Sequence, residues 1–110
     1  MRMVMTTDLV SKPELIADYE AQHRAIWPEV AASLRAIGIK ELKIYRLETR
    51  LVMVMEVPEG FDKEKDFARH MASHPRCRSW EELMSGYQLA PPGAAQGQKW
   101  GEMAEIFELP

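Results

Sequence analysis

The stretch Glu41–Val57 constrains the fold more than any other segment, because it holds two short β-forming runs separated by the polar residues ETR. The first run, ELKIYRL, is rich in β-branched and aromatic residues. The second run, RLVMVMEV, is apolar on both faces of its pleat. Together they predict a β-hairpin whose second strand lies in the centre of a sheet and is covered on both sides.

A long amphipathic helix is expected before this hairpin. Apolar residues recur every three or four positions up to Ile37, which predicts one buried face, and Gly38 is a plausible stop. Pro28 lacks an amide hydrogen and crowds the preceding turn. We therefore expect the helix to kink or restart near Trp27.

The remaining segments extend the alternation of strands and helices. Met3–Leu9 is short and apolar and predicts a first strand. After a turn at Pro58–Phe61, the apolar spacing over Phe67–Tyr87 predicts helical segments interrupted near Pro75. The last run, Glu102–Leu109, follows a loop rich in proline and glycine and alternates well enough to predict a closing strand.

The predicted order of strand, helix, strand, strand, helix, strand is that of the ferredoxin-like α+β fold. The helices would cover one face of an antiparallel sheet and leave the other face bare in a single copy. Pairing two such sheets across a twofold axis would bury the bare face. The chain is thus expected to form one domain over residues 1–110 and a homodimer of the dimeric α/β-barrel type.

Composition excludes several classes of partner. Fourteen Lys and Arg against seventeen Asp and Glu give a net charge of −3, without a basic cluster suited to nucleic acid. The longest apolar run, Leu51–Met55, is too short to cross a bilayer, and the N-terminus lacks an export signal. Cys77 is the lone cysteine and cannot form an internal disulfide. These features favour a cytoplasmic protein.

Tyr19, His23 and Trp27 are four residues apart in turn, so a helix would place them on one stripe. An imidazole exchanges a proton near neutral pH, a phenol offers a hydrogen bond, and an indole offers an apolar plane. This set suits a small polyhydroxylated ligand. The alternative is that the two aromatic residues pack in the core and the histidine is solvated at its edge. Spacing alone favours this packing interpretation.

No metal or nucleotide site is predicted. His70 and His74 have the spacing of a zinc-binding pair, but only Cys77 is nearby as a third ligand, and a chance surface pair is the better interpretation. Neither PEGF nor APPGAAQG follows a strand and opens a helix, as a phosphate-binding loop requires.

Two further tryptophans are candidates for a site. Trp80 has Cys77, Leu83 and Met84 as helical neighbours, which favours core packing. Trp100 lies in GQKWGEM at the entrance to the last strand, where it would either cap the mouth of a pocket or anchor the long loop. We expect the charged residues beside it to be solvated.

The stretch Tyr19–Val30, YEAQHRAIWPEV, resembles a motif of the L-rhamnose mutarotase family, in which Tyr, His and IWPE occur at the same spacing. The segments IYRLETRLVMVMEV, SWEELM and EIFELP fall in matching order, so the resemblance covers nearly the whole chain. It implies a dimeric ferredoxin-like fold and a cofactor-free isomerase that interconverts the α and β anomers of a 6-deoxy-L-sugar.

The same resemblance implies roles for individual residues. His23 matches the proton donor of the family, and Tyr19 and Trp80 match sugar-binding residues. This sequence differs from the rhamnose enzymes at two positions. Those enzymes typically have a tyrosine where this chain has Leu42 and a second tryptophan where it has Glu81. Since both differences alter contacts expected to face the sugar, and related members are associated with L-fucose, the expected substrate is L-fucose or L-rhamnose, with L-fucose favoured.

Mutarotation opens the hemiacetal by moving a proton onto the ring oxygen while another leaves the anomeric hydroxyl, and it needs no metal or redox cofactor. His23 is expected to protonate the ring oxygen, and Tyr19, Glu29 or water could carry the second proton. Trp80, Trp27 and Trp100 are candidates to contact the apolar face of the sugar.

Two other functions share this order of elements. One is a haem-degrading or antibiotic-biosynthesis monooxygenase, since a fold alone does not choose between activities. The other is a sugar-binding dimer without catalysis.

Overall fold

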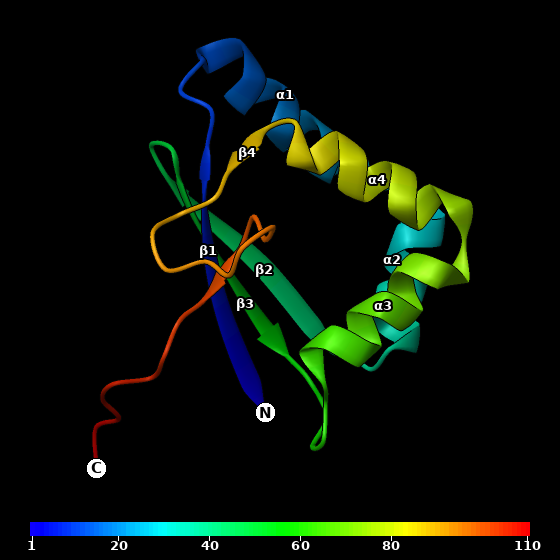
Figure 1. Ribbon diagram of the computed structural model, residues 1–110, viewed down its shortest axis with the longest axis vertical. Coiled ribbons are helices and arrows are strands. Elements are labelled where there is room, and N and C mark those ends of the chain that lie inside the picture. The colour runs from blue at the N-terminus through cyan, green and yellow to red at the C-terminus, as the bar shows by residue number, and fades with distance from the viewer.

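The strand β1 organises the sheet of this α+β fold (Figure 1). In the computed structural model, which describes residues 1–110, the sheet has the order β2-β3-β1-β4, with β5 also paired to β1. The strands are β1 Arg2–Leu9, β2 Glu41–Leu47, β3 Arg50–Glu56, β4 Gln88–Leu89 and β5 Gly101–Glu102. The helices are α1 Pro13–Arg24, α2 Pro28–Ala36, α3 Lys63–Ser73 and α4 Pro75–Ser85. All neighbouring strands are antiparallel.

The four helices lie on one side of the sheet, so the predicted ferredoxin-like arrangement is confirmed (Figure 1). Alternate residues of β1 face the helices and are buried: Met3, Met5, Thr7 and Leu9. Full burial of an apolar side chain such as Leu9 stabilises the fold by about 1.5–3 kcal/mol. The hairpin β2–β3 also forms as predicted, and Glu48 in its turn adopts a positive φ of 52°.

Proline divides both helical regions. The predicted restart near Trp27 is confirmed, because α1 ends at Arg24 and Pro28 is the first residue of α2. One continuous helix up to Ile37 is therefore replaced by two. Pro75 begins α4 in the same way, where a missing amide hydrogen removes no helical hydrogen bond. Each region thus contributes two short helices.

Of the predicted closing strand over Glu102–Leu109, only Glu102 lies in a strand, so the predicted extent is wrong. Residues 88–89 and 101–102 form two short strands that both pair with β1, and residues 90–100 leave and rejoin the sheet between them. Backbone pairing ends where the amide of Met103 donates to the carbonyl of Val4. The segment 104–109 then runs away from the sheet with Ile106, Phe107 and Leu109 exposed (Figure 1). Its alternating pattern predicts a strand, but the segment leaves β1 after Met103 and does not pair with Arg2 or Met3.

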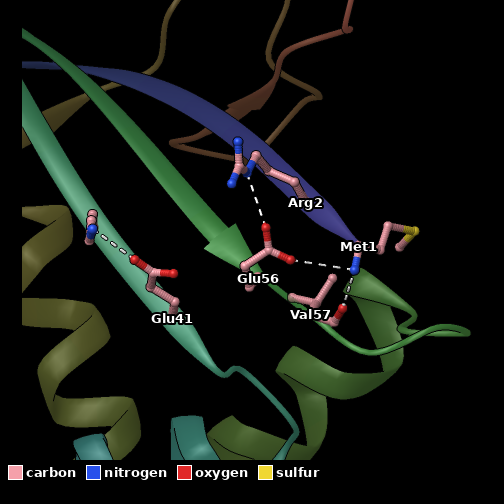
Figure 2. Close-up of polar contacts among 6 residues, drawn as sticks. Met1, Arg2, Glu41, Glu56 and Val57 are labelled. Carbon is pink, nitrogen blue, oxygen red and sulfur yellow. Dashed lines mark hydrogen bonds and ion pairs between the residues drawn. The ribbon is translucent and has the colours of Figure 1, made fainter.

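Polar contacts fasten the first residues of β1 to the end of β3 (Figure 2). Arg2 lies opposite Glu56 in the register, and its Nε is 3.1 Å from the carboxylate. The terminal amino group of Met1 donates to the carbonyl of Val57 at 2.8 Å and lies 3.5 Å from Glu56. Exposed ion pairs contribute only about 0–1 kcal/mol each. The backbone hydrogen bonds between β1 and β3 therefore contribute more than these ion pairs to holding the two strand ends together.

His70 lies between α3 and α2 in a hydrogen-bonded network, so the prediction of a surface position is wrong. Its Nδ1 is 2.7 Å from Ser33 Oγ, which is 2.7 Å from Ser73 Oγ, and Ser73 donates to the carbonyl of His70. These three short contacts are satisfied together when Nδ1 donates to Ser33 and Ser33 donates to Ser73. His74 is instead exposed at the start of α4, where its Nδ1 accepts from the amide of Arg76. The two histidines therefore belong to separate local structures.

None of the four helices is long and apolar enough to cross a membrane.

We expect the stability of the protein to depend on pH through His70. Burial lowers the pKa of His70, so the unfolded chain takes up a proton at a higher pH than the folded chain. The free energy of unfolding should fall as the pH is lowered from 7 through the ordinary imidazole pKa of about 6.5 to pH 5. In His70→Asn this fall should be smaller, as measured by urea unfolding at several pH values.

His74→Asn is the matched control, because asparagine caps helices well at this exposed position. An identical pH dependence in the parent and in His70→Asn would contradict the assignment.

Candidate active site

Aromatic rings from α1, from α4 and from the residue before α2 form a row between α1 and α4. Tyr19 and His23 of α1 have ring centroids 4.4 Å apart, and the ring of His23 lies 5.4 Å from that of Trp80 of α4. Trp27, the residue before α2, follows at 5.2 Å from Trp80. The helix break at Pro28 turns the chain at this point. Four of the five predicted site residues are thus brought together.

The imidazole of His23 is fixed through one nitrogen. Its Nδ1 is 2.9 Å from the backbone carbonyl of Tyr19, one turn earlier in α1. Because a carbonyl oxygen only accepts hydrogen bonds, Nδ1 carries the proton in this contact. Nε2 has no hydrogen-bond partner in the protein, and the side chain is half-buried. His23 can therefore exchange a proton through Nε2 while Nδ1 holds its ring in place.

Tyr19 is buried beside the histidine with 3% of its surface exposed. Burial raises the pKa of its phenol to about 12, and the nearby charge of Glu81 acts in the same direction, whereas a hydrogen bond from Gln88 opposes the rise. Gln88 Nε2 donates to the phenol oxygen at 3.3 Å. Tyr19 therefore keeps its proton at neutral pH and can donate a hydrogen bond.

Trp27 lies at the outer end of the aromatic row. The guanidinium of Arg76 lies 4.2 Å from its ring centroid and covers one face. Arg76 also forms an ion pair with Glu29 at 3.1 Å. Trp27 therefore packs between Arg76 and Trp80, while Trp80 itself is buried in the core with Cys77 and Met84, as its helical spacing predicts.

Trp100 reaches the site from residues 90–100. The hydroxyl of Thr7, in the buried row of β1, donates to the carbonyl of Lys99 at 2.5 Å and fixes the end of this loop. The indole packs against both hydrophobic clusters of the core. Trp100 also lines an open pocket of about 400 Å³ together with Glu81 and Lys99. It therefore anchors the loop and forms part of the pocket wall.

A family model described as L-rhamnose mutarotase matches residues 2–109. This chain belongs to the L-rhamnose mutarotase family. An L-fucose mutarotase of Xanthomonas campestris pv. campestris is 47% identical over 110 residues, covering 98% of this chain and 87% of that protein. An L-rhamnose mutarotase of Escherichia coli O8 is 31% identical over 98 residues, covering 89% of each chain.

The fold is also that of a solved member of the family. The crystal structure of an L-rhamnose mutarotase from Formosa agariphila superposes with a TM-score of 0.69 at 17% identity, covering 100% of this chain and 99% of that one. At this identity the likeness shows the fold alone. Family membership rests on the sequence matches.

Three polar residues at the site of this family member were not predicted from the sequence. The sequence marks Glu81 only as a difference from the rhamnose enzymes, and it predicts a solvated Lys99. No sequence pattern points to Gln88. Gln88 is buried in β4, and its amide oxygen has no hydrogen-bond partner in the protein. The amino group of Lys99 donates to the backbone carbonyl of Gln88 at 3.2 Å. The position of Glu81 directly after Trp80 was the one available clue.

A larger hollow of about 480 Å³ lies on the outer surface where α3 meets α4. His74 and Arg78 line it, and none of the aromatic row does. The pocket of about 400 Å³ also lacks these four rings, but Glu81 in its wall follows Trp80 in α4, and Trp100 packs against the core cluster that contains Trp80. The candidate site is therefore the aromatic row together with this pocket.

Tyr19→Phe tests the buried phenol of this site. The substitution leaves the amide group of Gln88 without its partner, and an unpaired buried donor costs about 1–3 kcal/mol. The free energy of unfolding at pH 8 should fall by this amount in urea denaturation. Between pH 10 and 12 the parent should also lose stability that the variant keeps, because the unfolded phenol ionises first.

Tyr45→Phe is the control, because Tyr45 is exposed on β2. Equal stabilities of the two variants would contradict the buried hydrogen bond.

Proposed function

We propose that the protein is a mutarotase that interconverts the α and β anomers of a 6-deoxy-L-hexose without a cofactor. The observation that carries the proposal is the free Nε2 of His23 among aromatic rings, in a chain of the L-rhamnose mutarotase family. A positioned acid or base commonly accelerates a reaction by about 10²–10⁴. One histidine beside a sugar pocket supplies acceleration of this order.

His23 acts in its imidazolium form, because Nδ1 already holds a proton in the contact with Tyr19. Nε2–H protonates the ring oxygen of the sugar as the bond between that oxygen and the anomeric carbon breaks. The anomeric hydroxyl loses its proton and becomes the aldehyde carbonyl. Rotation about the bond from C1 to C2 exposes the other carbonyl face, and closure by the reverse proton transfers gives the opposite anomer.

The aromatic residues bind the sugar in this proposal. Tyr19 donates a hydrogen bond to a sugar oxygen, which its protonated phenol supports. The exposed part of Trp80, 7% of its surface, meets the apolar side of the pyranose beside His23, and the half-buried Trp27 extends this surface. Trp100 closes the site from the loop, as its place in the pocket wall supports.

L-Fucose is the proposed substrate, with L-rhamnose as the alternative. An L-fucose mutarotase is 47% identical to this chain, whereas the L-rhamnose mutarotase of Escherichia coli is 31% identical. Leu42 and Glu81 replace aromatic residues typical of the rhamnose enzymes. Glu81 lines the pocket, so the difference at this position is placed where it can contact a sugar hydroxyl.

We also propose that the active form is a homodimer in the cytoplasm. The face of the sheet opposite the helices carries the half-buried Val52 and Val54 and the exposed Tyr45. The C-terminal segment exposes Ile106 and Phe107 with 94% and 71% of their surfaces free. A second copy would cover both surfaces. The buried free thiol of the lone cysteine suits a reducing compartment.

His23→Ala tests the proposed acid. The rate of anomer exchange of L-fucose, measured by saturation-transfer NMR, should fall by about 10²-fold or more because the proton donor is lost. His74→Asn should exchange the sugar at the parental rate, since His74 lies outside the site. A folded His23→Ala with parental activity would show that His23 is not the acid.

The C-terminal segment tests the homodimer. In the double variant Ile106→Ser, Phe107→Ser, the dimer dissociation constant should rise at least about tenfold, as loss of an apolar anchor does. Analytical ultracentrifugation over a range of concentrations measures it. Glu108→Ser changes a polar neighbour in the same segment and should leave association intact. A parent protein that stays monomeric at high concentration would refute the homodimer.

A further inference from the structure

We propose that Glu81 is the second proton-transfer group of the site, and that it takes the proton of the anomeric hydroxyl while His23 protonates the ring oxygen. The inference rests on the proposed mutarotase function and adds a catalytic residue to it. It assigns a role to a position at which this chain differs from the rhamnose enzymes.

The fold places Glu81 where the aromatic row meets the pocket. Glu81 follows Trp80 on α4, and successive residues of a helix point about 100° apart. Trp80 therefore turns into the core against His23, while Glu81 lines the open pocket with Lys99 and Trp100. The negative charge of Glu81 is also close enough to Tyr19 to affect that phenol. Glu81 is also the residue next to Trp80, whose ring centroid lies 5.4 Å from that of His23.

The carboxyl of Glu81 has no structural partner. It takes part in none of the ion pairs or side-chain hydrogen bonds of the chain. Glu29, the carboxylate that the sequence offered as second proton carrier, is instead paired with Arg76. Although the Glu81 side chain is open to solvent on one side, the surrounding protein partly desolvates its carboxyl and raises its pKa. This brings the pKa of the carboxyl closer to neutral pH, where the group can both accept and return a proton.

Gln88 provides an independent indication that a polar ligand binds here. Its side chain has 3% of its surface exposed, and its amide nitrogen is engaged with Tyr19. Its amide oxygen is buried without a hydrogen-bond donor from the protein. Buried acceptors are rarely unpaired, and a sugar hydroxyl is a suitable donor. Gln88 therefore places an unpaired acceptor beside the phenol of Tyr19.

The proton transfers balance over one turnover. The cycle starts with the imidazolium of His23 and the carboxylate of Glu81. Ring opening moves one proton from Nε2 to the ring oxygen and one from the anomeric hydroxyl to Glu81. It leaves a neutral imidazole, a carboxylic acid and the open-chain aldehyde. After rotation, Glu81 returns its proton to the carbonyl oxygen, His23 takes the proton of the attacking hydroxyl, and both groups are restored.

Glu81→Gln tests the proposal, because glutamine keeps the size and polarity of the side chain but cannot carry the proton. The maximal exchange rate of L-fucose anomers should fall by about 10²-fold, with KM near the parental value. The parent should lose activity on acidification as Glu81 becomes protonated, and the variant should lack this acidic limb. Tyr19, His23, Lys99 and Glu82 are the other titratable groups of the site, and they are unchanged in the variant. Glu81→Asp should recover part of the rate and the acidic limb.

The controls separate this proposal from its alternatives. Glu64→Gln makes the same charge change on exposed α3 and should keep the parental rate. Equal losses in Glu82→Gln and Glu81→Gln would attribute the effect to pocket charge and overturn the assignment. A rise in KM at constant maximal rate in Glu81→Gln would show that Glu81 binds the sugar without moving a proton. If the parent accelerates no 6-deoxy-L-hexose, the proposed function fails, whereas parental kinetics in Glu81→Gln refute only the role of Glu81.

Discussion

Burial of one face of β1 is the constraint on which the rest of this structure depends. The strand pairs with β3 on one edge and with β4 and β5 on the other, and its alternate side chains meet the helices. Thr7 in this buried row donates its hydroxyl to the carbonyl of Lys99. The same hydroxyl also lies 3.2 Å from the carbonyl of Leu89, so Thr7 holds both ends of the loop of residues 90–100 against β1. The same row thus forms the core and positions the pocket wall that contains Trp100.

The breaks in the helices are part of how the site is built. Pro28 and Pro75 each begin a helix, where their missing amide hydrogen is tolerated. The first break turns the chain at Trp27, so this indole meets Trp80 of α4. In one uninterrupted helix, Trp27 would continue along the same face as Tyr19 and His23, without this turn. The site therefore combines rigid helical positions with a bend that only a helix restart provides.

The chemistry of the site follows from how its polar groups are held. The backbone carbonyl of Tyr19 accepts a hydrogen bond from Nδ1 of His23, and Nε2 of the same ring has no partner in the protein. Burial keeps the phenol of Tyr19 protonated, and partial burial raises the pKa of Glu81. Tyr19 is thereby kept as a hydrogen-bond donor, whereas the shift of Glu81 moves that carboxyl toward the pH range in which it can accept and return a proton. Family membership and geometry thus support the same activity by independent routes.

The sequence by itself determined the order of elements, the central β-hairpin strand and the helical spacing that aligns Tyr19 with His23, because these depend on local periodicity. Its matching motif also indicated the family. It could not determine that Gln88 donates to the phenol of Tyr19 or that the charge of Glu81 acts on that phenol, since these residues come from β4 and α4 and are brought toward α1 only by folding. The last strand was misplaced for the same reason. Alternation shows that a segment can pair, but only the tertiary structure decides which segment obtains an edge of β1.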